Sequence, residues 1–130
     1  SSFVDEDGEI RELSDSLGGV FIIIKGATDI IYSGEEECLA SCEEGGLKRC
    51  GGIGDILSGV TAVLVQWACR FCDPKLENSD RHGSIAWALW TSSCIVKRCA
   101  KETFESKRRA MVASDMVNQL GKTFDEMMSE

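Results

Sequence analysis

The sequence contains very little proline, histidine or tyrosine, with one residue of each among 130. The single histidine, His82, falls in a polar stretch, which disfavours a Ser-His-Asp triad. Apolar runs are all far shorter than the roughly 20 residues that a membrane-spanning helix needs, and no signal-peptide pattern opens the chain. We therefore expect neither a membrane segment nor histidine-based nucleophilic catalysis.

Basic residues are also in the minority, with 14 lysines and arginines against 22 acidic residues and a net charge of -8. This balance disfavours a nucleic acid or an anionic membrane as a partner. A phosphate-binding site would have to be built from a local group of positive charges. With 43% hydrophobic residues, the chain can bury the core of one domain.

The seven cysteines are odd in number and form no regular framework. We read them as reduced thiols of an intracellular protein, cytoplasmic or mitochondrial. Cys69 and Cys72 have the two-residue gap of a zinc pair, but Cys69 falls near the end of a helical pattern and no second pair repeats the gap. We therefore predict free thiols and no metal bound by protein side chains.

Short apolar runs come first along the chain. A short amphipathic helix is expected within residues 1–18, and strands are expected around residues 29–32 and 38–42. Residues 20–24, VFIII, form a continuous β-branched and aromatic run, which is typical of a strand buried on both faces in a parallel or mixed sheet.

Helical periodicity dominates the rest, predicting helices over about residues 56–71, 84–107 and 114–128. Apolar residues on their stripes are expected in the core, including Trp67, Trp87, Trp90, Val117, Leu120, Phe124 and Met128. So few strands do not complete an α/β domain, and the chain starts without methionine. We expect part of a longer protein.

The stretch RCGGIGDILSG, residues 49–59, places four glycines and Asp55 at the start of the first long helix. Glycines permit positive φ angles and present no Cβ to a ligand that approaches the backbone. The first amides of a helix have no intrahelical partners, and the helix dipole favours negative charge there. Gly51, Gly52 and Gly54 therefore predict an anion cradle. Asp55 is placed either to cap the helix or to accept a proton from a reacting hydroxyl.

Two familiar phosphate motifs do not fit this stretch. A P-loop would need lysine and then serine or threonine after its second glycine, but Gly59 is followed by Val60 and Thr61. A dinucleotide fingerprint that starts at Gly52 would need a small residue in place of Leu57. As a bare pattern, glycines and an aspartate at a helix start are explained by helix capping and a tight turn about as often as by an anion site.

Two blocks in this order, IIIKGATDIIYSG and RCGGIGDILSGVTAVLVQWA, resemble the carboxyl-terminal half of the ATP-dependent NAD(P)H-hydrate dehydratases of the ribokinase-like superfamily. SDMVNQLGKTF, residues 114–124, resembles the last helix of that family. The resemblance implies that residues 1–130 are the carboxyl-terminal part of a single ribokinase-like, YjeF-type carbohydrate-kinase domain. Its fold class is α/β, an α/β/α sandwich of which this chain holds a few strands followed by about three helices.

The resemblance also implies a reaction, in which ATP with Mg²⁺ phosphorylates the ring hydroxyl of hydrated NADH or NADPH and phosphate then leaves to restore the nicotinamide ring. Asp55 matches the catalytic base, and Lys25 matches the lysine beside the nucleotide. Arg49 is added because it precedes the glycines, although an exposed loop explains it equally well. The candidate nucleotide and phosphate contacts are Lys25, Gly26, Arg49, Gly51, Gly52 and Gly54.

Other readings of these residues stay open. Lys48 is a further basic candidate, Ser114 and Asp115 match a region near the nucleotide base, and Ile53 stands where the family usually has a polar residue. Without the resemblance, Lys25 is a surface lysine.

Two alternative functions stay open. One is a small-molecule kinase of the same superfamily, acting on a vitamin or sugar hydroxyl, and the other is a non-catalytic fragment. We expect little turnover from the isolated chain, and a homo-oligomer stays open.

Overall fold

The computed structural model describes residues 2–4, 8–34, 37–71, 73–75 and 78–130. Short strands precede long helices, which confirms the α/β class. The predicted short first helix and three long helices are all present, whereas the first strand was not predicted. The elements are β1 (Ser2–Val4), α1 (Glu9–Ser16), β2 (Ile22–Ile24), β3 (Ile30–Tyr32), β4 (Glu37–Ala40), α2 (Ile53–Phe71), α3 (Asn78–Lys107), the 3-10 helix η1 (Arg108–Ala110) and α4 (Ala113–Met128).

The strands form an antiparallel sheet in the order β1-β4-β3-β2. Within the described residues β2 pairs only with β3, in a register that sets Ile23 opposite Ile31, and Ile24 is exposed. The prediction of a strand buried on both faces in a parallel or mixed sheet is therefore wrong. Only five residues connect β2 to β3, whereas a parallel pair needs a crossover of about a dozen or more.

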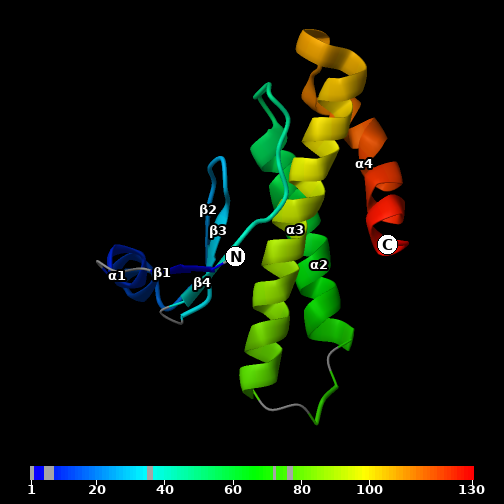
Figure 1. The fold of residues 1–130 in the computed structure, drawn as a ribbon. Coiled ribbons are helices and arrows are strands. Elements are labelled where there is room, and N and C mark those ends of the chain that lie inside the picture. The colour runs from blue at the N-terminus through cyan, green and yellow to red at the C-terminus, as the bar shows by residue number, and fades with distance from the viewer. Residues whose placement is uncertain (1, 5–7, 35–36, 72, 76–77) are drawn as a thin grey trace.

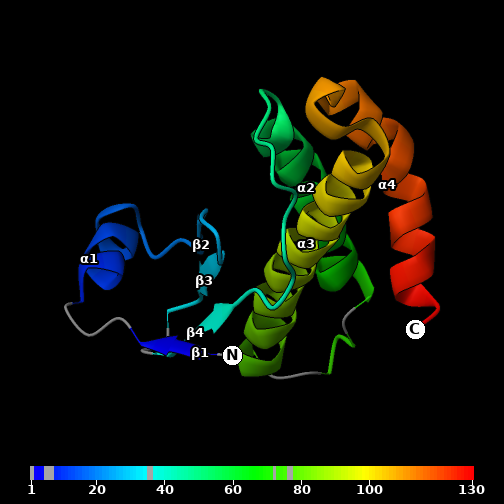
Figure 2. The same cartoon turned by 45° about the horizontal axis from the view of Figure 1, so that its top comes forward.

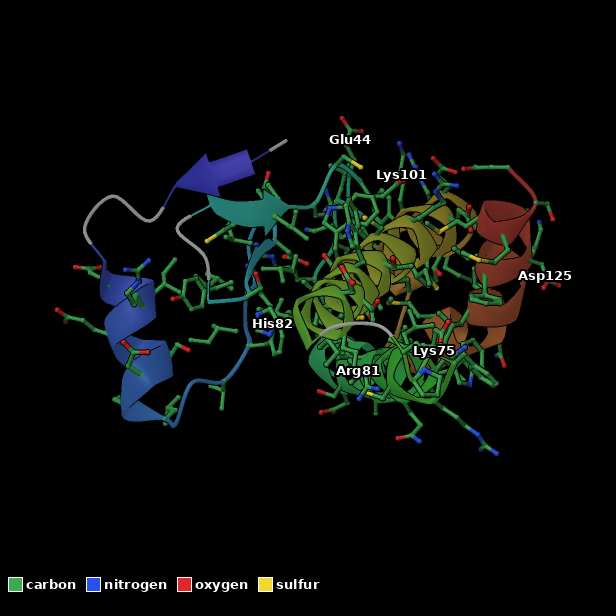
Figure 3. The ribbon with its side chains drawn as sticks, turned by 90° about the horizontal axis from the view of Figure 1, so that it is seen from below. Glu44, Lys75, Arg81, His82, Lys101 and Asp125 are labelled. Atoms are coloured by element: carbon green, nitrogen blue, oxygen red, sulfur yellow. The ribbon has the colours of Figure 1, made fainter. Side chains whose placement is uncertain are left out.

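The elements are arranged in layers around the sheet. Helix α1 lies on one side of it, and α3 lies on the other (Figures 1 and 2). Helices α2 and α4 pack along α3, so α3 runs through the centre of the helical part. His82 near the start of α3 donates from Nε2 to the carbonyl of Ser33, and its ring centroid lies 4.5 Å from that of Phe21, which ties this helix to the sheet (Figure 3).

The main core lies where α2, α3 and α4 meet. Its buried members are Leu57, Val96, Cys99, Ala100, Met111 and Met116. The partly buried Ile23 of β2 and Ile53 of α2 pack against this cluster, which joins the sheet edge to the start of α2.

Several residues predicted for the core are instead exposed. Trp87 is 56% exposed, and Trp67, Val117 and Met128 are also exposed. Tryptophan is rarely buried completely. Trp67 contacts Phe124 in a T-shaped arrangement, with 6.3 Å between the ring centroids, while 46% of its surface stays exposed. The partly buried Trp90 does reach the interior, where its indole N–H donates to the carbonyl of Ala40 at 2.9 Å. On α4, the buried positions are Met116 and Thr123, with Leu120 and Phe124 partly buried.

In the part of the chain that the structure describes, no helix is long and apolar enough to cross a membrane. Among the same residues, no group of three or more histidine, cysteine or acidic side chains is placed to hold a metal ion. Cys72 lies outside the described residues, so the structure gives no geometry for its spacing with Cys69. The free cysteines that it does describe are Cys38, Cys42, Cys50, Cys69, Cys94 and Cys99.

Candidate active site

A cleft of about 740 Å³ opens beside the start of α2. Its walls come from the turn between β2 and β3, from the loop that precedes α2, from the first turns of α2 and from the middle of α3. The lining residues are Lys25, Gly26, Ala27, Asp29, Glu44, Gly45, Gly46, Leu47, Lys48, Arg49, Cys50, Ile53, Gly54, Leu57, Val96, Lys97 and Ala100. Two segments that are distant in sequence, one at Lys25 and one at Gly54, thus meet at a single hollow.

The cleft is locally basic although the chain as a whole is acidic. Its charged lining residues are Lys25, Lys48, Arg49 and Lys97 against Asp29 and Glu44. The net charge of the sequence is -8. A local excess of positive charge of this kind attracts an anionic ligand despite the overall repulsion.

Two of the four basic side chains are held by the protein itself. Lys97 Nζ lies 3.4 Å from the Asp29 carboxylate. Lys48 Nζ donates to the carbonyl of Met111 at 2.9 Å and also to the carbonyl of Arg109, so it fastens the loop before α2 to η1 and the residue after it. Lys48 therefore has a structural role.

Lys25 and Arg49 make no hydrogen bond or ion pair with any other described residue. Lys25 Nζ lies 3.3 Å from the position that a Cβ on Gly54 would occupy, which places its ammonium against the first turn of α2. The exposed Arg49 lies at the same cleft. These two cations are therefore available to a phosphate.

The glycine turn before α2 depends most on Gly52. Its φ of +96° is in the left-handed region, and a Cβ there would lie 2.8 Å from the Cβ of Ala113. The carbonyl of Gly52 accepts the amide of Ile56 at 3.1 Å, which opens the helix. Gly51 and Gly54 do not have positive φ angles, so the conformational argument applies to Gly52 alone. At Gly54 the missing Cβ instead gives Lys25 room.

Asp55 is the third residue of α2 and is exposed. Its carboxylate makes no hydrogen bond with the other described residues, so the structure shows no capping role for it. Asp55, Gly51 and Gly52 do not line the cleft, whereas Lys25, Gly26, Arg49 and Gly54 do. The structure therefore places the predicted base next to the predicted phosphate contacts, one residue beyond Gly54, and outside the hollow itself.

Three residues that the sequence did not single out organise the cleft wall. The buried Asp29 accepts the Gly26 amide at 2.9 Å and the Ser93 hydroxyl at 2.6 Å. Lys97 donates to the carbonyls of Gly26 at 2.9 Å and Ala27 at 3.0 Å. No local motif marks the contact between Asp29 and Lys97 in the sequence, because the two residues are far apart in the chain.

The remaining candidates have other partners. Asp115 accepts the amide of Val112 at 2.9 Å and so caps α4. Asp115 also lines a separate hollow of about 180 Å³ between α3 and α4, which Ser114 does not line. The side chain of Ile53 packs against the core, so this position stabilises the start of α2 by burial rather than by hydrogen bonding.

The cleft does not provide a protein cage for Mg²⁺. Asp29 is already engaged by Lys97 and Ser93, and Glu44 is mostly exposed and pairs with Lys101 at 3.4 Å on the outer surface (Figure 3). Magnesium bound with nucleotides is often held by phosphate oxygens and water together with one or two carboxylates. The described residues of this cleft thus fit the phosphates better than they fit the ion.

Comparison with known proteins identifies the family. Residues 5–122 match the family profile described as NAD(P)H-hydrate dehydratase, a span that includes both walls of the cleft. The chain belongs to this family.

Relatives of the NAD(P)H-hydrate dehydratase family also match almost the whole chain. The ATP-dependent (S)-NAD(P)H-hydrate dehydratase of Bos taurus is 35% identical over 120 residues, which are 92% of this chain and 35% of the bovine protein. The protein of the same name from Homo sapiens is 32% identical over 95% of this chain and 34% of its own length. That from Mus musculus is 30% identical over 96% of this chain and 35% of its own. The resemblance read from the two motifs is confirmed, and the chain spans about a third of each relative.

Proposed function

We propose that this chain carries the nucleotide-phosphate site and the catalytic base of an ATP-dependent dehydratase that repairs hydrated NADH and NADPH. In this proposal residues 1–130 form the carboxyl-terminal part of a single ribokinase-like domain. The observation that carries it is the position of the Lys25 ammonium against the first turn of α2, at a basic cleft of an acidic chain. The names of the relatives supply the reaction.

The chemistry explains why such an enzyme would use ATP. Hydroxide is a poor leaving group, and phosphate is a good one. The ring hydroxyl attacks the terminal phosphorus of ATP and ADP leaves. This attack forms an oxygen–phosphorus bond. The existing carbon–oxygen bond of the ring then breaks and phosphate leaves, a proton is lost from the neighbouring carbon, and the ring double bond is restored. Phosphoryl transfer depends mainly on positioning and on stabilisation of charge.

The residues of this chain have distinct tasks in that sequence. The amides in the first turn of α2, which include that of Gly54, have no partners within the helix and are available to the transferring phosphoryl group. Lys25 and Arg49 neutralise nucleotide phosphate oxygens. Asp55 takes the proton from the attacking hydroxyl, since its carboxylate is exposed and is not engaged by other described residues. General-base catalysis of this kind contributes roughly 100- to 10,000-fold.

An Asp55→Asn substitution tests the proposal in the full-length polypeptide that contains these residues. We expect kcat for release of reduced nicotinamide from hydrated NADH to fall at least about 100-fold, with ATP binding preserved. Asp80→Asn is the matched control, because Asp80 is also exposed in the first turn of a long helix. It should leave kcat unchanged.

The products decide between the proposal and its alternatives. Free phosphate together with reduced nicotinamide supports the dehydratase. A phosphorylated product that is retained would instead indicate a small-molecule kinase, and unchanged turnover in Asp55→Asn would refute the assigned base. Three further points stay predictions: low turnover of the isolated chain, use of ATP with Mg²⁺, and a cytoplasmic or mitochondrial location. A homo-oligomeric state stays open.

A further inference from the structure

We infer that Asp29, Ser93 and Lys97 form a positioning device, here called the turn anchor, that holds Lys25 at the start of α2 for nucleotide binding. The inference rests on the proposed function, because it takes the ligand of the cleft to be a nucleotide. None of the three side chains is required to touch that ligand. They act on the turn between β2 and β3, residues 25–29, and through it on Lys25.

Asp29 is the centre of the turn anchor. Its carboxylate is buried, with 7% of the side chain exposed, and receives one backbone amide, one hydroxyl and one ammonium group. A carboxylate taken out of water is strongly unfavourable unless such partners surround it. Because Gly26 and Ser93 both donate to it, Asp29 fastens the turn to α3.

Lys97 supplies the second fastening. Its side chain is 12% exposed, and its ammonium group donates to the carbonyls of both Gly26 and Ala27. These two carbonyl dipoles are thereby directed at a cation of α3. Because these two carbonyl oxygens are already paired with Lys97, they do not compete with an incoming phosphate for the ammonium of Lys25.

Helix α3 is the common frame for both sides of the cleft. Ser93 and Lys97 are four residues apart and project from the same face of this helix. The same helix packs along α2, whose first turn contains Gly54. The distance between Lys25 and Gly54 therefore depends on α3, although neither residue belongs to it.

The test measures ATP binding by calorimetry in the full-length polypeptide and uses Lys97→Met, Lys97→Arg and Ser93→Ala. We expect Lys97→Met to weaken ATP binding about 10- to 100-fold, since small misplacements of a binding group have effects of that size. Lys97→Arg keeps a cation with several donors and should restore binding to within about threefold. Ser93→Ala removes one donor and should weaken binding less than Lys97→Met. Lys101→Met is the matched control, because Lys101 lies one turn further along α3 in an exposed ion pair, and it should bind ATP normally.

A double-variant cycle separates positioning from a direct contact or from general destabilisation. If Lys97 acts through Lys25, Lys97→Met should have almost no further effect on ATP binding once Lys25→Met is present. Additive losses would overturn the inference, as would normal binding by Lys97→Met. Urea unfolding monitors the fold, and where Lys97→Met unfolds, the same cycle with Ser93→Ala decides.

The two proposals fail in different ways. A wild-type protein that does not bind ATP overturns both of them. A wild-type protein that binds ATP, with a Lys97→Met variant that binds it equally well, overturns the turn anchor alone. Loss of turnover in Asp55→Asn with unchanged ATP binding remains the separate signature of the base.

Discussion

Lys25 of the β2–β3 turn and Gly54 of α2 show how two single residues shape the candidate site. The Lys25 ammonium occupies space that a side chain on Gly54 would restrict, since only 3.3 Å separate Nζ from the position of the missing Cβ. That close approach brings a flexible cation to helix amides that lack partners. The absence of one side chain on Gly54 thus gives the Lys25 ammonium its position at the candidate site.

Gly54→Ala should change the stability of the fold and the affinity for ATP in opposite directions. Alanine is favoured over glycine inside a helix by about 0.5–1 kcal/mol, and Gly54 does not have a positive φ. The added methyl group would displace the Lys25 ammonium. We expect the variant to resist urea slightly better than the wild type while ATP binding weakens several-fold.

Gly59→Ala is the control for this prediction, because Gly59 lies further along α2 with open space around its Cβ position. It should gain stability and bind ATP as the wild type does. Unchanged ATP binding in Gly54→Ala would show that the Lys25 position does not matter for the nucleotide.

At the scale of elements, α3 and α4 are joined by buried polar contacts as well as by apolar packing. Thr123 of α4 is completely buried and donates its hydroxyl to the Glu102 carboxylate of α3. Gln119 donates to the same carboxylate oxygen at 2.9 Å. The hydrogen bond explains why a threonine occupies a core position that the apolar stripe did not predict.

Thr123→Val tests this junction. Valine has the shape of threonine but removes one donor from Glu102, so we expect a loss of about 1–3 kcal/mol in the free energy of unfolding. The neighbouring Lys122→Ala removes only an exposed ion pair with Glu126, so it should stay within about 0.5 kcal/mol of the wild type. Urea unfolding measures both, and equal losses would contradict the role of the buried hydroxyl.

Much of the element order could be predicted because helical periodicity is a strong local signal. The helices α2, α3 and α4 follow from the spacing of their apolar residues. The direction and edge position of β2 could not, since a run such as VFIII reports burial but does not report which strand will pair with it. The exposure of Trp87 likewise depends on packing that periodicity does not contain.

The candidate site could be predicted in part, because some of its residues also belong to local sequence motifs. The glycine turn and Lys25 belong to local motifs, and the structure brings Lys25, Arg49 and Gly54 to one cleft. The contact between Asp29 and Lys97 joins residues that are far apart in the chain. Such a pair has no local signature.

Across the whole molecule, the cysteines differ sharply in accessibility. Cys42 and Cys69 are exposed, whereas Cys94 and Cys99 are buried. Burial raises the pKa of the Cys94 thiol and that of the Cys99 thiol above their ordinary values. Since the thiolate is the reactive form, both the burial and the raised pKa lower the reactivity of the Cys94 and Cys99 thiols.

Thiol labelling of the folded chain, followed by mass spectrometry, should modify Cys42 and Cys69 first and Cys94 and Cys99 only on unfolding. Equal labelling rates at Cys42 and Cys94 would contradict this assignment.

The raised thiol pKa values also make the free energy of unfolding depend on pH. A thiol pKa that is higher in the folded state stabilises the fold below the ordinary pKa of about 8.5, and this contribution is lost as the pH rises through the folded-state pKa.

The contact between Gly52 and Ala113 also has an evolutionary consequence. A Cβ on Gly52 would lie 2.8 Å from the Ala113 methyl group, so the glycine turn and the first residue of α4 share one small space. A lineage in which residue 113 became larger would have to move the glycine turn before α2. The two positions are therefore expected to be inherited as a pair, and drift at the start of α4 is limited by the turn that opens α2.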